Sequence, residues 1–148
     1  MPEPERNIVT NRRARYDYHL HDRFEAGIAL LGSEVKSLRA GKANLQEAYV
    51  RLQPGGAWLV GCHISPYTHA NRLNHEPLRE RRLLLNRREI HKLKRGTREK
   101  GMTIVPLRLY FKGSLVKVEL ALAKGKRLHD KRQTLKARDA KREMDRGR

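Results

Sequence analysis

The chain has 148 residues, and its 34 lysines and arginines outnumber its 16 aspartates and glutamates, which gives a formal net charge of +18. The length fits one domain, and 38% hydrophobic residues suffice for one compact core. The single cysteine, Cys62, excludes an internal disulfide and a cysteine-rich zinc site. No apolar stretch approaches the roughly 20 residues that span a bilayer, and no secretory signal is visible, so we expect a cytoplasmic protein that does not associate with membranes.

The first 45 residues predict two strands and one helix. Residues 1–10, with two prolines and two glutamates, are typical of a mobile leader, and we place the folded domain at residues 11–123. Apolar runs predict strands at 16–20 and 24–31. Ser33 as N-cap and Gly41 just past the last turn then predict a short helix over residues 33–40.

The middle of the chain predicts a hairpin followed by a long loop. Residues 45–52 form the next apolar run, and Pro54-Gly55-Gly56 is a turn signal before a strand around Trp58. Alternation predicts that four side chains of this second strand face the same way: Trp58, Val60, Cys62 and Ile64. Residues 63–78, with two prolines and several polar residues, are typical of a loop.

A helix and two strands follow. Asn86 and Glu89 have the spacing of a capping box, and Gly96 is expected to end this helix. Strands are predicted at 102–111 and 116–122, with Pro106 at an edge or a bulge. Six strands joined by short turns, with two helices, predict a mainly β fold, a small antiparallel barrel.

Residues 124–148 form a separate basic tail. They hold eleven lysines and arginines against four acidic residues, and they have too few apolar side chains to build a core. The residues are mostly good helix formers, but an isolated helix of about 19 residues is marginal in water. We therefore expect the tail to be disordered when free.

The net charge indicates a polyanionic partner, because a cationic surface gains affinity by releasing the counterions of phosphates. Nucleic acid is the leading partner class, and an anionic membrane surface is a distant second. The seven histidines lack the spacing of a zinc site, and no nucleophile stands beside an acid-base pair, so we expect neither a metal or other cofactor nor catalysis. We also expect a monomer.

Five segments resemble those of one known family. They are NRRARYDY (11–18), FEAGIALLGSEVKSLRAGKANL (24–45), HISPYTHANRLNHEP (63–77), RRLLLNRREI (81–90) and ALAKGKRLHDKR (121–132). They are similar to those of small protein B, the SsrA-binding or tmRNA-binding protein of bacteria. The resemblance implies an oligonucleotide-binding-type β-barrel with two flanking helices and a basic C-terminal tail. It also implies trans-translation, in which the protein binds the tRNA-like domain of tmRNA, enters the A site of a stalled ribosome and stands in for the anticodon arm.

The resemblance also implies a set of residues that bind tmRNA. Composition and spacing explain several of them in other terms. The helix dipole stabilises a carboxylate in the first turn, as at Glu34; a leucine in an apolar triplet, such as Leu84, is usually buried; and an outward lysine such as Lys117 is often only solvated. The implied tmRNA-binding residues are Asn11, Arg12, Arg13, Arg15, Glu34, Lys36, Leu84 and Lys117.

For the end of the domain and the tail, the resemblance implies contacts near the decoding centre of the small ribosomal subunit, with the tail helical in the empty mRNA path. The residues concerned are Lys124, Lys126, Arg127, His129, Asp130, Lys131, Arg132, Lys136, Arg138, Lys141 and Arg142. Two alternatives stay open at this stage: an RNA-processing or RNA-modifying enzyme, and a ribosomal or initiation-factor-like RNA-binding protein.

Overall fold

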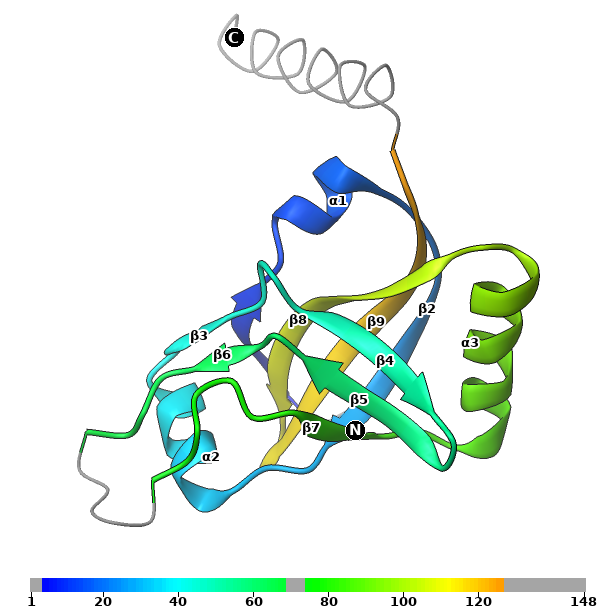
Figure 1. Cartoon of the computed structure of the whole chain (residues 1–148). Coiled ribbons are helices and arrows are strands. Elements are labelled where there is room, and N and C mark those ends of the chain that lie inside the picture. Colours follow the sequence, from blue (N-terminus) through cyan, green and yellow to red (C-terminus); the bar gives the residue numbers. More distant parts are fainter. Residues whose placement is uncertain (1–3, 69–73, 127–148) are drawn as a thin grey trace, which may run out of the picture.

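The computed structural model describes residues 4–68 and 74–126 and has a mainly β architecture (Figure 1). Seven strands form one antiparallel sheet in the order β1-β8-β9-β2-β7-β5-β4, and β3 and β6 form a two-stranded ribbon. The strands are β1 (Glu5–Thr10), β2 (Tyr18–Ile28), β3 (Ala43–Asn44), β4 (Tyr49–Gln53), β5 (Gly56–Val60), β6 (His63–Ile64), β7 (Arg81–Leu84), β8 (Thr103–Lys112) and β9 (Leu115–Gly125). The helices are α1 (Arg13–Asp17), α2 (Gly32–Arg39) and α3 (Arg87–Glu99).

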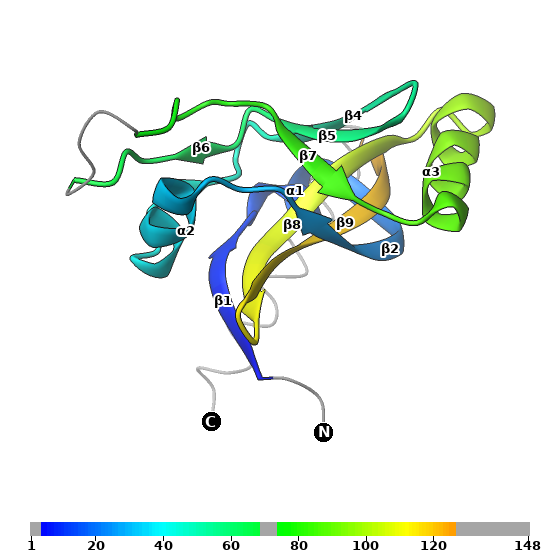
Figure 2. The ribbon, with the colours of Figure 1, turned by 90° about the horizontal axis from the view of Figure 1, so that it is seen from below.

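The sheet bends around one main core. Leu59, Leu109 and Leu120 are fully buried within it, and Leu93 of α3 closes it on one side. Figure 2 shows α2 and α3 on opposite sides of the sheet. The strand ladder ends at β1 and β4, and within the described residues these edges are not paired with each other. The mainly antiparallel β fold is therefore confirmed, whereas strand pairing does not close the sheet into a barrel.

The structure extends the folded domain on its N-terminal side, where a mobile leader was expected. Glu5–Thr10 is strand β1, which pairs antiparallel with β8. Ile8 and Val9 pack against the core, and the Gly113 amide donates to the Pro4 carbonyl at 3.1 Å. The two apolar side chains Ile8 and Val9 suffice to hold this segment as a strand, because the free backbone donors and acceptors along the edge of β8 pair with it.

The two strands predicted at 16–20 and 24–31 are one strand, β2, while Tyr16 belongs to α1. A bulge between Leu20 and Arg23 shifts the register against β9. One extra residue at a bulge resets the alternation of side chains, which is why the sequence shows two runs. Pro106 lies at a second register shift, between β8 and β9, as its position in the sequence predicted.

For strand β5 and the residues that follow it, the prediction that alternate side chains share one face was wrong. Ala57 and Leu59 point into the core, so Trp58 and Val60 lie on the outer face, whereas Cys62 and Ile64 are fully buried. The four residues predicted to share one face therefore divide into two pairs. The cause is Gly61, whose φ of +77° interrupts the strand between the pairs and reverses the alternation.

Both predicted helices exist, with corrected ends. The N-cap of α2 is Leu31 instead of Ser33, and the Leu31 amide donates to Glu34 Oε1 at 2.7 Å. The capping box of Asn86 and Glu89 in α3 is confirmed. Gly96 does not end α3, since the helix continues to Glu99. A Cβ at Gly96 would lie 2.7 Å from both Cδ atoms of Leu122, so the glycine permits close packing of helix on strand.

We expect Gly96→Ala to lower the free energy of unfolding by about 1–2 kcal/mol. The added methyl group overpacks the contact with Leu122, and this cost exceeds the stability gained from the higher helix propensity of alanine. Urea denaturation followed by circular dichroism measures it. Gly32→Ala in α2 is the matched control, since nothing lies within 4 Å of its added Cβ. Equal effects of the two substitutions would contradict this account of Gly96.

Candidate nucleic-acid interface

Lys117 and Leu84 lie in one row on the outer face of the sheet. Gly27 of β2 stands opposite Lys117 of β9 on one side and opposite Leu84 of β7 on the other. Leu84 is 55% exposed, although it lies in an apolar triplet. A Cβ at Gly27 would be 3.2 Å from the Leu84 Cβ, so the leucine side chain covers the glycine. The row therefore presents a cation and an apolar side chain with no side chain between them.

Glu25 lies on the same outer face, two residues before Gly27 along β2. Tyr110 donates a hydrogen bond to its carboxylate, and Lys112 Nζ lies 3.2 Å from Oε1. The hydrogen bond from Tyr110 is the main reason why the pKa of Glu25 is lowered; Lys112 and Lys117 add to it, while burial opposes it. Sequence reasoning missed this residue. Its signal was the alternation of Glu25 with the inward Phe24 and Ala26, which places an acid on the outer face.

Glu34 does not face solvent. Its side chain has no exposed surface, and both oxygens are occupied by Arg81 Nε, by Arg79 Nη2 at 2.6 Å and by the Leu31 amide at 2.7 Å. Burial by itself would raise the pKa of Glu34, but these hydrogen bonds together lower it. The direct contact with RNA expected of Glu34 therefore has no exposed atom to make it, and the carboxylate instead joins α2 to β7.

Lys36, two residues after Glu34 in α2, is exposed. Its Nζ lies 5.4 Å from the centroid of the Tyr67 ring, which is a cation-π distance. Lys36 thus keeps its charge at the surface beside an aromatic ring. It lies on the α2 side of the molecule, with the residues that Glu34 holds in place.

The cluster at the start of the domain is divided by burial. Asn11 is only 8% exposed; its side-chain amide donates to the Pro106 carbonyl at 3.0 Å, at the bulge of β8. Arg12, Arg13 and Arg15 are exposed on and beside α1, and Arg13 lies 3.9 Å from both Asp17 and Glu47. Asn11 therefore fixes the segment to the sheet, and the three arginines carry the surface charge.

The structure separates the predicted residues into two groups. Tyr18 pairs with Gly125 at one end of β2, and Gly27 pairs with Lys117 at the other. Nine residues of strand, at about 3.3 Å each, set these ends about 30 Å apart. Leu84 and Lys117 lie at the second end, whereas the α1 arginines lie at the first, beside the end of β9 (Figure 1).

Two of the predicted tail residues are described, and both lie at the α1 end. Lys124 of β9 is exposed and stands opposite His19 of β2. The Lys126 amide donates to the Asp17 carbonyl and its Nζ to the Arg15 carbonyl, each at 2.8 Å. The remaining residues of the prediction lie outside the described residues: Arg127, His129, Asp130, Lys131, Arg132, Lys136, Arg138, Lys141 and Arg142.

The described residues contain no group of three or more histidine, cysteine, aspartate or glutamate side chains that could hold a metal ion. His75 is buried between Ser33 Oγ, at 2.9 Å from Nδ1, and the Ile64 carbonyl, at 2.8 Å from Nε2. Burial raises the pKa of Cys62 to about 11, so this thiol is protonated and unreactive at neutral pH. Among the helices of residues 4–68 and 74–126, none is long and apolar enough to cross a membrane.

Comparison with known proteins identifies the family. The model of the SmpB protein family matches residues 8–148. The chain belongs to the SmpB protein family. The SsrA-binding protein of Symbiobacterium thermophilum is 60% identical over 141 residues, which cover 94% of this chain and 89% of that protein. The SsrA-binding protein of Carboxydothermus hydrogenoformans is 54% identical, with 95% of each chain covered.

A solved structure supports the same assignment. It is described as "tmRNA-SmpB: a journey to the center of the bacterial ribosome", and the chain matches one of its chains with a TM-score of 0.68 at 42% identity. The match covers 86% of this chain and 93% of that one. The resemblance found in the sequence is therefore confirmed for the family.

We expect Glu34→Gln to lower the free energy of unfolding by about 3–5 kcal/mol at pH 7, because it leaves the buried Arg81 guanidinium without its counter-charge. Urea denaturation measures the loss. Glu89→Gln is the matched control: it occupies the same capping position in α3, where glutamine also serves, and should cost about 0.5 kcal/mol or less. A loss no larger at Glu34 than at Glu89 would refute the role of the buried pair.

The same pair predicts a dependence on pH. The pKa of Glu34 is lowered below its ordinary value of 4.5 on folding, so its contribution to stability is complete above pH 4.5 and is lost as the pH falls through the lowered value. The difference in unfolding free energy between the wild type and Glu34→Gln should therefore shrink in acid. Denaturation curves at a series of pH values test this; a difference that grows in acid would give the wrong sign.

Proposed function

We propose that this protein binds tmRNA and acts in trans-translation. It binds the tRNA-like domain, delivers tmRNA to the A site of a stalled ribosome and stands in for the anticodon arm, so that the nascent peptide is tagged for degradation and the ribosome is released. The observation that carries this proposal is the family match over residues 8–148, together with relatives up to 60% identical that are SsrA-binding proteins. The net charge of +18 supports an RNA partner.

The outer face around Gly27 supports a tmRNA-binding surface. The Lys117 ammonium can neutralise a phosphate, and the exposed Leu84 side chain offers an apolar contact to a ribose or a base edge. Between them, Gly27 leaves the backbone accessible at close range. The ionised Glu25 beside them can accept a hydrogen bond from a base amino group or a 2′-hydroxyl. This use of an outer sheet face is what the resemblance implies for an oligonucleotide-binding-type fold, here with a strand ladder that stays open between β1 and β4.

The α1 end of the sheet supports further RNA contacts: the arginines there are the residues expected to bind tmRNA, and the lysines are those expected to contact the ribosome. Arg12, Arg13 and Arg15 are exposed there, and Lys124 and Lys126 lie beside them. The α1 end is about 30 Å from Lys117. One RNA helix end can therefore occupy the face around Gly27 while another RNA contacts the α1 end. The tail that follows Lys126 would then occupy the mRNA path near the decoding centre. The protein would act in the cytoplasm, as a monomer and without catalysis of its own.

Retention of tmRNA on the immobilised full-length chain tests this proposal. We expect Lys117→Glu to weaken binding more than Lys92→Glu does, because Lys117 lies in the row with Leu84 whereas Lys92 is exposed on α3. Both substitutions change the charge equally, so the comparison isolates position. Filter binding at one fixed salt concentration gives the two affinities, and equal losses would mean that only net charge matters.

We expect deletion of residues 133–148 to leave tmRNA binding nearly intact and to abolish peptide tagging on stalled ribosomes. The sheet supplies the tmRNA contacts in this proposal, while the tail supplies those in the mRNA path. Filter binding and a reconstituted tagging assay with a message that lacks a stop codon measure the two activities. Tagging at the normal rate by the truncated protein would remove the proposed role of the tail.

A further inference from the structure

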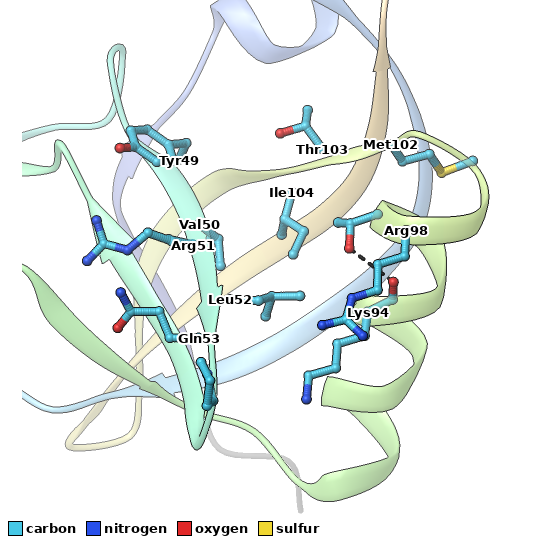
Figure 3. Close-up of a pocket in the computed structure, with 12 residues that line it drawn as sticks. Tyr49, Val50, Arg51, Leu52, Gln53, Lys94, Arg98, Met102, Thr103 and Ile104 are labelled. Carbon is cyan, nitrogen blue, oxygen red and sulfur yellow. Dashed lines mark hydrogen bonds between the residues drawn. The ribbon is translucent and has the colours of Figure 1, made fainter.

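A cross-strand row of two arginines and the only tryptophan of the chain lies on the outer face of β4, β5 and β7. Trp58 stands opposite Arg51 on one side and opposite Arg82 on the other. The residues before and after each of them point into the core. Figure 3 shows this alternation on β4, where Val50 and Leu52 point toward Ile104 and Arg51 points the other way.

Trp58 keeps part of its side chain exposed, although an indole in a β-sheet protein is usually well buried. Side chains directly opposite each other on adjacent strands have Cβ atoms about 4.5–5.5 Å apart, so both guanidinium groups lie within reach of the indole. The cation-π contacts found among the described residues involve Phe111, Tyr67 and Tyr110, and none of them engages Trp58. The indole therefore has two cationic neighbours that do not cover its face.

The two arginines are held beside the indole by different partners. Arg51 Nη2 lies 2.6 Å from Glu80 Oε2, which balances its charge, while its Nε has no partner among the described residues. Arg82 Nη2 donates to the Gly55 carbonyl at 3.2 Å, a neutral acceptor, and no acidic side chain among the described residues forms an ion pair with Arg82. The row thus carries a net positive charge next to a partly exposed aromatic ring.

We propose that Arg51, Trp58 and Arg82 form a stacking platform for one unpaired nucleotide of RNA, with the base on the Trp58 indole and its phosphate at Arg82. This combination of an aromatic ring with flanking cations binds single-stranded RNA without regard to sequence, since every base has a π-face and every nucleotide a phosphate. The proposal rests on the proposed function and extends it to a further part of the surface.

The position of the platform fits a continuous RNA path. Arg82 and Leu84 are alternate residues of β7 and point to the same outer face. The platform therefore adjoins the row of Leu84, Gly27 and Lys117 proposed to bind tmRNA. Gly56 of β5 is buried, and a Cβ built there would lie 3.7 Å from Arg82 Nε, so the Arg82 guanidinium lies over this glycine, two residues before Trp58.

The fluorescence of Trp58 reports directly on this site, because it is the only tryptophan. We expect an octamer of riboadenylate to quench the emission of the full-length protein and an abasic ribose-phosphate octamer of equal charge to leave it nearly unchanged. Stacking needs a base, whereas binding of phosphate alone does not. Equal quenching by the two octamers, or no quenching by either, would overturn the proposal.

Affinity for a fluorescein-labelled riboadenylate octamer, measured by anisotropy, provides the second test. Trp58→Leu should weaken binding about fivefold or more, and Trp58→Phe, which keeps a ring, should lose much less. Circular dichroism shows whether each variant is folded. If neither variant folds, the comparison of the two octamers on the wild-type protein still tests whether a base stacks on Trp58. Folded Trp58→Leu that binds as tightly as wild type would refute the platform.

Failure of this proposal can be distinguished from failure of the proposed function. A protein that retains tmRNA but shows no base-dependent quenching binds tmRNA without the platform. A wild-type protein that does not retain tmRNA contradicts the proposed function, whatever the octamers do. Arg82→Gln should weaken binding of both octamers, because it removes the phosphate contact that they share; an unchanged affinity for the abasic octamer would overturn the role given to Arg82.

Discussion

Glu34 and Arg81 form an ion pair with no exposed side-chain surface, and the arrangement of α2, β6 and β7 depends on it. A buried charge is tolerated only where its hydrogen-bonding groups have partners, and Arg81 also donates to the carbonyls of Cys62 and Pro77. One guanidinium therefore joins α2 to two backbone carbonyls, those of Cys62 and Pro77. Because loss of either side chain would leave the other as an unpaired buried charge, the pair fixes how β7 joins the sheet.

That constraint determines the chemistry of the surface. With Arg81 and Leu83 directed into the core, Arg82 and Leu84 must point outward. The strand consequently buries a cation and exposes a leucine, the reverse of the usual pattern for a half-buried strand. The exposed leucine lies over Gly27 beside Lys117, and the exposed arginine lies beside Trp58. The two proposed RNA contacts on the outer face are thus both products of the way β7 is held from inside.

The sequence predicted what local patterns determine and missed what distant contacts determine. The alternation of Val116 with Lys117, the capping box at Asn86 and the bulge at Pro106 are local, and each was confirmed. Strand β7 was missed because one of its two buried residues is an arginine, whose counter-charge is 47 residues away. For the same reason the exposed Leu84 could be assigned only through the family resemblance. Burial of Glu34 and Asn11 also followed from distant partners, which no periodicity records.

The pairing of β2 with β9 has a mechanical consequence. Strand β9 is paired with β8 on one side and with β2 on the other, and such central strands are among the last parts of a fold to open, whereas β2 pairs with β7 only at Gly27 and Ile28. The two paired strands therefore behave as a stiff spacer of fixed length between Gly27 and the α1 end. Rotation of an RNA bound beside Lys117 would accordingly rotate the whole sheet, and with it the direction in which the chain leaves the sheet at Lys126.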